Sequence, residues 1–188
     1  MRSFLHLVKV TLGLEEPHTQ VTPAELELLT QYAKGAGLVV ELGCFEGKTT
    51  AELARAARRV ISIDPFFAGR AGFSWGEMIA RQHARRTGAA NVTFIKKFSQ
   101  DATGDVSEPI DFMFIDADHT YEGVKRDWEM WSPKMRPGGL IALHDSRVAP
   151  NSPDPDLGSV KFFAEEISKM KNVREVAGID SLAIVQVG

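Results

Sequence analysis

Short apolar runs alternate with amphipathic stretches along most of the chain. The apolar runs are nearly continuous in Val, Ile, Leu and Phe, as in strands that are covered on both faces of a sheet. They lie at residues 38–42, 60–64, 92–96, 110–116 and 140–145. The intervening stretches carry apolar residues at helical spacing and lie at residues 48–58, 74–87 and 120–131. This alternation predicts a doubly wound α/β fold around a parallel sheet.

The end of the chain departs from this alternation. After a predicted helix at residues 157–170, two strands are expected at 172–177 and 181–187. Only residues 178–180 separate them, which is too short for a crossover connection, so the two strands must be antiparallel neighbours. The sheet is therefore expected to be mostly parallel and to end in a reversed hairpin.

Two helices are expected before the first strand. Residues 1–16 are apolar with polar interruptions, which favours an amphipathic helix over a signal peptide. Residues 22–25, Thr-Pro-Ala-Glu, have the order of a helix N-cap, a first-turn proline and a capping-box glutamate. We expect residues 1–34 to form a helical segment that covers the body or contacts a second subunit, and residues 35–188 to form one ligand-binding domain.

Composition narrows the possible functions. The 188 residues are 44% hydrophobic and 25% charged, an ordinary mix for one globular domain. A net charge of -3 argues against a nucleic-acid partner, which requires a basic face. The single cysteine, Cys44, fits a reducing compartment such as the cytoplasm. No apolar run is long enough to predict a membrane span.

The turn after the first strand, ELGCFEG at residues 41–47, is the candidate ligand site. Gly43 and Gly47 let the backbone turn sharply and approach a ligand closely. The next helix presents its N-terminal amides there. Asp64 ends the second strand, where an acidic residue can accept hydrogen bonds from both ribose hydroxyls. The alternative is a plain strand-to-helix turn, with Asp64 as a cap.

The same turn departs from a dinucleotide site. A pyrophosphate favours glycine at the position of Phe45, and Glu46 would repel phosphate. The acidic residue before the turn, Glu41, suits a ligand with a positive amino group. S-adenosylmethionine has such an amino group, a ribose and no phosphate, so the pattern favours it over NAD.

With these motifs the chain resembles the class I S-adenosylmethionine-dependent methyltransferases. The likeness runs in order through residues 41–47, 61–64, 110–123 and 137–145 and includes the reversed hairpin. The most similar branch is the small-molecule O-methyltransferases that need a divalent metal, including those that act on sugars. The resemblance implies a seven-stranded sheet of order 3-2-1-4-5-7-6, with strand 7 antiparallel and helices on both faces.

The resemblance also implies a cofactor site at the strand ends. Its residues would be Glu41, Gly43, Gly47, Asp64, Ser99 and Asp116. The first three would surround the methionine part, Asp64 would hold the ribose, and Ser99 would lie near the adenine. Relatives often have Gly-Asp-Ser where residues 97–99 are Lys-Phe-Ser, so no carboxylate is expected beside Ser99.

Ionisable residues end the fourth and fifth strands. Asp116 ends the fourth, and His144 and Asp145 end the fifth. Neighbouring strands lie about 4.8 Å apart, so these side chains could converge on one divalent cation. Mg²⁺ or Mn²⁺ is expected, although metal-dependent relatives commonly carry an acidic residue or Asn where His144 stands. That difference shifts the preference toward Mn²⁺, Fe²⁺, Co²⁺ or Zn²⁺. The alternative is strand-end capping without a metal.

Asp118 and His119, which follow the fourth strand, are the candidate general bases. In sugar-modifying relatives a residue at the offset of Asp118 or His119 removes the proton. Histidine has a pKa near 6.5, which suits proton removal near neutrality, so His119 is the first choice and Asp118 the second. The alternative is a loop histidine without a catalytic role.

The expected function is transfer of a methyl group from S-adenosylmethionine to a hydroxyl of a small molecule, such as a sugar or a vicinal diol. A divalent metal would assist, and the protein would be a homodimer joined through residues 1–34. The long loops at residues 65–76 and 146–158 would close over the site, where Arg70 and Arg147 could pair with an anionic acceptor. The alternatives are a metal-independent methyltransferase, an NAD-dependent dehydrogenase and a non-catalytic nucleoside-binding module.

Overall fold

The structure is a computed structural model that describes residues 2–69, 72–148 and 155–188. Arg70 and parts of both predicted lid loops lie outside the described residues. A seven-stranded sheet of order β3-β2-β1-β4-β5-β7-β6 forms the centre. Its strands are β1 (Val39–Leu42), β2 (Val60–Ile63), β3 (Val92–Ile95), β4 (Ile110–Ile115), β5 (Met135–Leu143), β6 (Val173–Ile179) and β7 (Leu182–Val187). Strands β1 to β5 are parallel, and β7 is antiparallel to β5 and β6. The predicted fold and strand order are confirmed.

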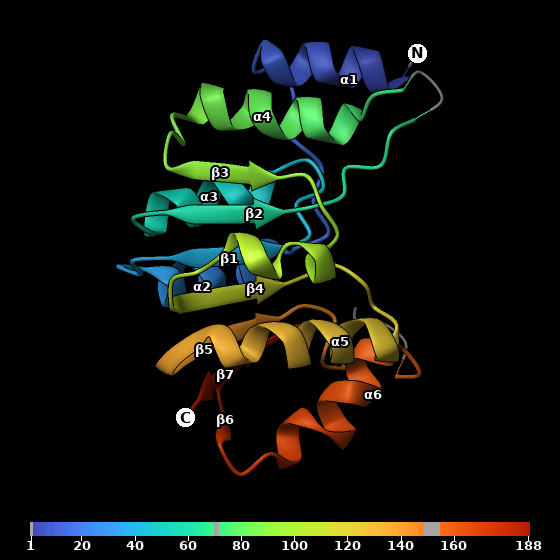
Figure 1. The fold of residues 1–188 in the computed structure, drawn as a ribbon. Helices are drawn as coiled ribbons and strands as arrows, with labels where there is room; N and C mark the ends of the chain where they lie inside the picture. Colours follow the sequence, from blue (N-terminus) through green and yellow to red (C-terminus); the bar gives the residue numbers. More distant parts are fainter. Residues whose placement is uncertain (1, 70–71, 149–154) are drawn as a thin grey trace.

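Helices cover both faces of this sheet. They are α1 (Arg2–Thr11), α2 (Pro23–Ala33), α3 (Lys48–Ala56), α4 (Trp75–Thr87), α5 (Tyr121–Trp131) and α6 (Gly158–Glu165). Short 3-10 turns lie at Ser99–Asp101, Thr103–Asp105, Ser132–Lys134 and Ile167–Lys169. In Figure 1, α5 and α6 lie in front of the sheet and α2 and α3 behind it, while α4 lies beyond β3 with α1 packed on it.

An apolar core fills each layer beside the sheet. Val40 and Leu42 of β1 face the cluster that contains Trp131 of α5. Val39 faces the opposite cluster, which contains Leu53 of α3. Both faces of the sheet are covered, so strand residues that point to either face are mostly apolar. This explains the near-continuous apolar runs in the sequence.

Local signals predicted the helix starts better than the start of β5. Thr22 caps α2 as expected: its side chain accepts a hydrogen bond from the backbone N–H of Glu25, and the Glu25 carboxylate accepts one from the N–H of Thr22. Strand β5 begins at Met135 instead of the expected residue 140. Residues 137–139, Pro-Gly-Gly, made this part of the strand look like a turn.

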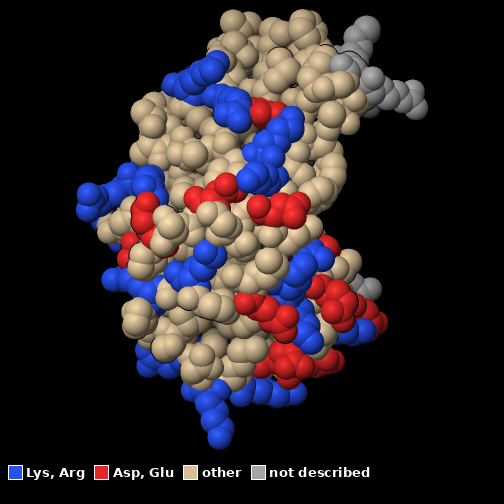
Figure 2. All heavy atoms as spheres, viewed as in Figure 1, with Lys and Arg blue, Asp and Glu red and all other residues tan. Residues whose placement is uncertain are grey.

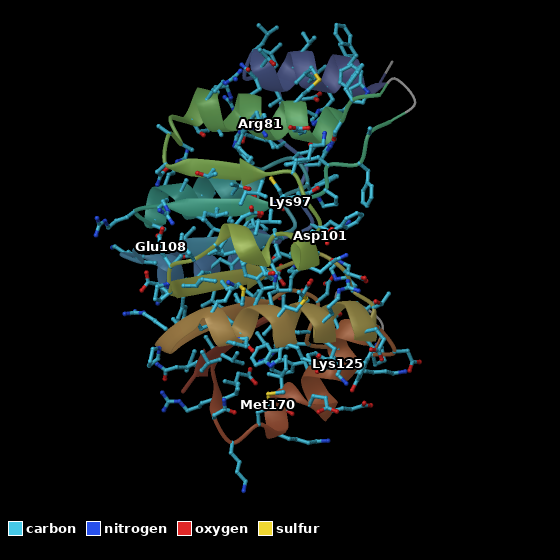
Figure 3. All side chains as sticks on the ribbon, in the orientation of Figure 1. Arg81, Lys97, Asp101, Glu108, Lys125 and Met170 are labelled. Carbon is cyan, nitrogen blue, oxygen red and sulfur yellow. The ribbon has the colours of Figure 1, made fainter. Side chains whose placement is uncertain are left out.

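The register of the parallel strands aligns their carboxyl ends. Leu42 of β1 pairs with Ile63 of β2 and with Ile115 of β4, and Ile115 pairs with Leu143 of β5. The next residue of each strand therefore falls in one row: Gly43, Asp64, Asp116 and His144. Figure 3 shows Lys97 and Asp101, which follow β3, at this same edge.

The N-terminal segment lies against the body of the domain. Helix α1 packs on α4, and α2 packs on α3. Helices α1 and α2 thus cover part of the body, whereas contact with a second subunit stays a prediction. Among the described residues, no helix has the length and apolar character that crossing a membrane requires.

Candidate active site

A cavity of about 920 Å³ opens at the carboxyl ends of the parallel strands. Its walls come from the turns after β1, β2, β3 and β4 and from the start of α4. His18, Thr19 and Gln20, which precede α2, complete the wall. A cavity of this size suits a ligand as large as a nucleoside derivative. The part played by residues 18–20 was not predicted, because nothing in their sequence marks a ligand site.

The two glycines of the first turn are required by contacts within the protein. Gly43 has a φ of 93°, and a Cβ on it would lie 1.9 Å from the carbonyl oxygen of Asp116. Gly47 has a φ of 78° as the N-cap of α3, and a Cβ there would lie 2.9 Å from Cα of Ala80. Gly43 lines the cavity, but its need for glycine comes from the neighbouring β4 turn.

Asp64 lines the cavity and shapes its rim. Its Oδ2 accepts hydrogen bonds from the backbone N–H groups of Cys44 at 2.8 Å and Phe45 at 3.0 Å. Its Oδ1 accepts one from the N–H of Phe66 at 2.6 Å. A carboxylate offers about four acceptor positions, so roughly one remains for a ligand hydroxyl in this conformation. The predicted hold on both ribose hydroxyls would require Asp64 to exchange one of these bonds.

Glu41 lies beneath the cavity instead of in its wall. Its side chain faces α3, where Oε2 accepts hydrogen bonds from Thr50 at 2.5 Å and Ser62 at 2.6 Å. Its residue exposure is 0%, and its Oε1 is a buried atom without a hydrogen-bond partner. Burial raises the pKa of Glu41 to about 8, although the two hydroxyl donors oppose the shift. The predicted direct contact with a ligand amino group is therefore not what this conformation presents.

Ser99 lines the cavity and has a carboxylate beside it, contrary to the expectation. The Ser99 hydroxyl donates to Oδ1 of Asp127 at 2.5 Å. Asp127 is fully buried in α5, and burial raises its pKa while the bond from Ser99 opposes the rise. The sequence pattern did not predict this carboxylate, because Asp127 lies in α5, far from Ser99 along the chain. Phe67 and Phe98 form an edge-to-face pair on the cavity wall, with ring centroids 5.7 Å apart.

A cluster of ionisable side chains occupies the ends of β4 and β5. Nδ1 of His144 lies 3.1 Å from Oδ1 of Asp116 and 3.6 Å from Oδ2 of Asp145. His119 faces the same two carboxylates, with Nε2 3.8 Å from Oδ1 of Asp116 and Nδ1 3.6 Å from Oδ2 of Asp145. Asp116 and His119 line the cavity. The structure thus places His144 beside both other candidate metal ligands, and the candidate base faces the same two carboxylates.

Glu25 belongs to this cluster, although its sequence context indicated only a helix cap. Its Oε2 lies 3.3 Å from Nε2 of His144, and its Oε1 accepts hydrogen bonds from the N–H and the hydroxyl of Ser181. Burial would raise the pKa of Glu25, but bonds with His144, Thr22 and Ser181 outweigh it and lower the pKa to about 2.

His144 carries the positive charge of the cluster. Burial alone would lower its pKa, but hydrogen bonds with Asp116 and Glu25 outweigh this and raise the pKa to about 10. Three carboxylates, Glu25, Asp116 and Asp145, therefore surround one imidazolium. The surplus negative charge favours a further cation at this end of the cavity.

Asp118 is engaged in holding the start of α5. Its Oδ1 accepts a hydrogen bond from the N–H of Thr120 at 2.9 Å, and Oδ2 lies 3.6 Å from a guanidinium nitrogen of Arg126. Burial would raise the pKa of Asp118, but Thr120 and Arg126 outweigh it and lower the pKa. Arg147, a candidate for binding an anionic acceptor, is paired with Glu175 of β6.

The residues at the strand ends fit a divalent cation in donor type and charge. With Nε2 of His144 directed at Glu25, a lone pair on Nδ1 could face an ion between Asp116 and Asp145, provided that Nδ1 gives up its proton. The ligand atoms of Asp116, His144 and Asp145 are not all close to one another, however. Within the described part of the chain, only His6, His18 and Glu46 have ligand atoms that all lie within 4.8 Å of one another.

Comparisons with known proteins agree with the motifs and the sheet. A family model described as a methyltransferase domain matches residues 40–146. The cofactor-bound structure of Rv0187 from MTB superimposes with a TM-score of 0.75 at 21% identity, covering 100% of this chain and 90% of that one. An O-methyltransferase from Bacillus cereus in complex with SAH gives a TM-score of 0.68 at 22% identity, covering 100% and 91%.

A curated relative matches only a short stretch. The uncharacterized protein y4gI of Sinorhizobium fredii is 33% identical over 55 residues, which are 29% of this chain. The matched stretch is 6% of the length of that relative.

Proposed function

We propose that this chain, which belongs to the methyltransferase-domain family and has the class I S-adenosylmethionine-dependent fold, methylates a hydroxyl group of a small molecule. The family match removes the dehydrogenase alternative. The acceptor class is proposed from the cluster at the ends of β4 and β5, and a sugar or a vicinal diol would suit it. The O-methyltransferase named among the similar structures is consistent with this choice.

One observation carries the proposal: His119 stands on the cavity wall between two carboxylates. Its ring nitrogens lie 3.8 Å from Asp116 and 3.6 Å from Asp145. Its side chain is 33% exposed, so a substrate hydroxyl can reach it from the cavity. An imidazole on the cavity wall can take the proton of a substrate hydroxyl that binds beside it.

The reaction is an in-line displacement at the methyl carbon. The acceptor oxygen attacks this carbon while the bond to the sulfonium sulfur breaks, and S-adenosylhomocysteine leaves. The proton of the acceptor hydroxyl passes to His119, which later releases it to solvent. The cavity walls contribute by aligning oxygen, carbon and sulfur, and such alignment supplies a large share of the rate enhancement in transfer reactions.

His119 is a better base than Asp118 in this structure. Asp118 already accepts a hydrogen bond from Thr120 and has a lowered pKa, so its carboxylate holds a proton poorly near neutrality. Its side chain is also what a Cβ on Gly123 would meet, at 2.2 Å from Cγ. We therefore assign Asp118 to positioning of the turn and His119 to proton transfer.

We further propose that Asp116, His144 and Asp145 hold a divalent cation during turnover, with Mn²⁺ or Mg²⁺ as the first candidates. When bound, such an ion would lower the pKa of an acceptor hydroxyl and fix its direction. One feature favours the metal-independent alternative: the imidazolium of His144 already sits between the two carboxylates. In that case His119 and alignment act alone.

The proposal is tested with the purified protein, S-adenosylmethionine and a panel of catechols, vicinal diols and sugars, with S-adenosylhomocysteine release as the readout. His119→Ala should slow turnover by about 10²- to 10⁴-fold while leaving the affinity for S-adenosylhomocysteine unchanged. Asp118→Asn, the matched neighbour, should slow turnover much less. Equal losses in both variants, or methylation found only on nitrogen or carbon, would contradict the assignment.

The need for a metal is measured separately. Turnover that stops with a chelator and returns with a single divalent ion would support the cation at Asp116, His144 and Asp145. Turnover that is indifferent to the chelator would favour the metal-independent reaction.

A further inference from the structure

Two histidines and a glutamate meet where the N-terminal segment crosses the turn after β1. His6 lies on α1, His18 lies in the connection to α2, and Glu46 lies in the glycine turn. One ligand atom from each of them lies within 4.8 Å of the other two. From the sequence, Glu46 was expected to repel the phosphate groups of a dinucleotide. In the structure its carboxylate faces these two histidines.

The spacing of the ligand atoms matches a metal site. Nε2 of His6 lies 2.9 Å from Oε2 of Glu46, and Nδ1 of His18 lies 3.2 Å from the same oxygen. Zinc binds imidazole nitrogen and carboxylate oxygen at about 2.0–2.2 Å. Neighbouring ligand atoms on one tetrahedral ion are therefore roughly 3.3–3.6 Å apart. The observed separations of 2.9 and 3.2 Å are hydrogen-bond distances slightly shorter than these values, so an ion would take the place of the bridging protons.

A second carboxylate prepares His6 as a ligand. Its Nδ1 lies 2.9 Å from Oε2 of Glu15, and Glu15 is itself paired with Lys9. A carboxylate on the far nitrogen holds the ring proton there and leaves the lone pair of Nε2 directed at the ion. This arrangement is the usual support behind a metal-binding histidine.

Burial gives the site two fixed ligands and one open side. The side chains of His6 and Glu46 are 11% and 10% exposed, whereas that of His18 is 65% exposed. The carboxylates of Glu15 and Glu46 both face His6, so this ligand is surrounded by negative charge. The exposed side at His18 leaves room for a water ligand and a path for entry.

We propose that His6, His18 and Glu46 bind a first-row transition metal ion of the zinc type, with water as the fourth ligand. Two imidazoles and one carboxylate suit Zn²⁺ better than Mg²⁺, which prefers oxygen ligands. The rings of His6 and His18 stack with centroids 4.0 Å apart and an interplanar angle of 14°. The exposed His18 ring must turn out of this stack so that Nδ1 points at the ion.

The ion would cross-link the N-terminal segment to the turn after β1, which contains Glu46. His18 is part of the cavity wall, and Glu46 follows Phe45, whose N–H is held by Asp64. Binding at this site therefore ties residues 6–18 to the rim of the cavity. This zinc site is separate from the strand-end cluster and does not depend on the proposed reaction.

The test is a zinc titration of the metal-free full chain by calorimetry, with bound metal counted by elemental analysis. The unmodified protein should bind one Zn²⁺ at this site, and His18→Ala and Glu46→Gln should weaken its binding by at least about tenfold. Glu15→Gln should weaken it by about ten- to 100-fold through the orientation of His6. Asp145→Asn should leave this affinity unchanged, because Asp145 belongs to the other cluster.

Folding is checked by circular dichroism. His18→Ala removes an exposed side chain, so this variant keeps the test valid if Glu46→Gln is unstable. A Co²⁺ titration should give the intense visible absorption of a tetrahedral site in the unmodified protein and lose it in His18→Ala. The proposal fails if zinc binds with unchanged affinity to His18→Ala and Glu46→Gln, if only Asp145→Asn weakens it, or if the unmodified protein binds no zinc.

Discussion

At the scale of single residues, the site is governed by where carboxylates are placed and what partners them. Glu25 and Asp116 bracket His144 and raise its pKa, whereas the buried Glu41 has an unpartnered oxygen and a raised pKa of its own. Asp64 accepts three hydrogen bonds from backbone N–H groups at the rim of the cavity. The same functional group thus serves as ion partner, buried acid and loop organiser, depending on its surroundings.

Replacing Asp64 tests its role as organiser of the rim. In Asp64→Ala the amides of Cys44, Phe45 and Phe66 lose their acceptor, so the turn should loosen and cofactor binding should weaken by about tenfold to 100-fold. Calorimetric titration with S-adenosylhomocysteine measures the change. Asp105→Ala, which removes only a surface partner of Lys97, is the control. Equal affinities in the two variants would show that Asp64 does not organise the site.

The raised pKa of Glu41 predicts a pH-dependent stability. The carboxyl titrates near 4.5 in the unfolded chain and near 8 in the folded protein, so only the folded state keeps its proton between these values. The free energy of unfolding should therefore fall as pH rises through this window. The glutamine of Glu41→Gln cannot titrate. The free energy of unfolding of this variant should therefore rise relative to that of the unmodified protein as pH increases.

Urea unfolding at both ends of the window measures this difference. Glu27→Gln, an exposed change on α2, is the control and should follow the unmodified protein at every pH. A stability difference between Glu41→Gln and the unmodified protein that stays constant with pH would refute the protonated state of Glu41.

At the scale of elements, the glycine turn is locked between its neighbours. It touches the turn after β4 at Gly43 and helix α4 at Gly47, and Asp64 at the end of β2 holds its amides. The parallel register brings these ends together, so the turn, Asp64 and Asp116 lie along one edge of the sheet. A change at the contact points should therefore unfold the edge instead of only altering ligand binding.

Gly43→Ala is the sharpest test of this packing. The new Cβ would lie 1.9 Å from the carbonyl oxygen of Asp116, at a φ of 93° that alanine disfavours. The free energy of unfolding should drop by at least about 3 kcal/mol. Gly104→Ala is the matched control, because nothing lies within 4 Å of its Cβ position, and it should change stability by less than about 0.5 kcal/mol. Chemical denaturation that ranks the two variants alike would be inconsistent with the contact.

At the scale of the whole molecule, the N-terminal segment is part of the site. Residues 18–20 line the cavity, and Glu25 contacts His144. Figure 2 shows acidic and basic side chains intermixed over the face that carries α5, and few charges where Figure 1 places α1. The absence of a nucleic-acid partner stays a prediction, as does the cytoplasmic location.

We expect a homodimer joined through the N-terminal segment. Leu12 and Leu14 are 65% and 71% exposed, and burial of such side chains would favour association. Light scattering should give a dimer mass for the unmodified protein and a monomer mass when Leu12→Ser and Leu14→Ser are combined. Val148→Ser, an equally simple change at another exposed apolar residue, should leave the dimer intact. A monomer mass for the unmodified protein would exclude this arrangement.

The sequence by itself determined the elements and the row of strand-end residues. Apolar runs of strand length between helical stretches require a parallel sheet, and a short connection before the last strand requires its reversal. Once the strands are parallel and neighbouring, Asp116 and His144 must lie close together, because the carboxyl ends of such strands share one edge. These conclusions depend on backbone geometry, which repeats from protein to protein.

Only the tertiary structure decided which side chains meet across that backbone. Glu25 contacts His144, Asp127 contacts Ser99, and Glu46 faces His6 and His18, although these partners lie far apart in the sequence. No local pattern encodes such contacts, because they follow from how helices from distant parts of the chain pack on the sheet. The direction of Glu41 was decided in the same way, by its position on the strand face that packs against α3.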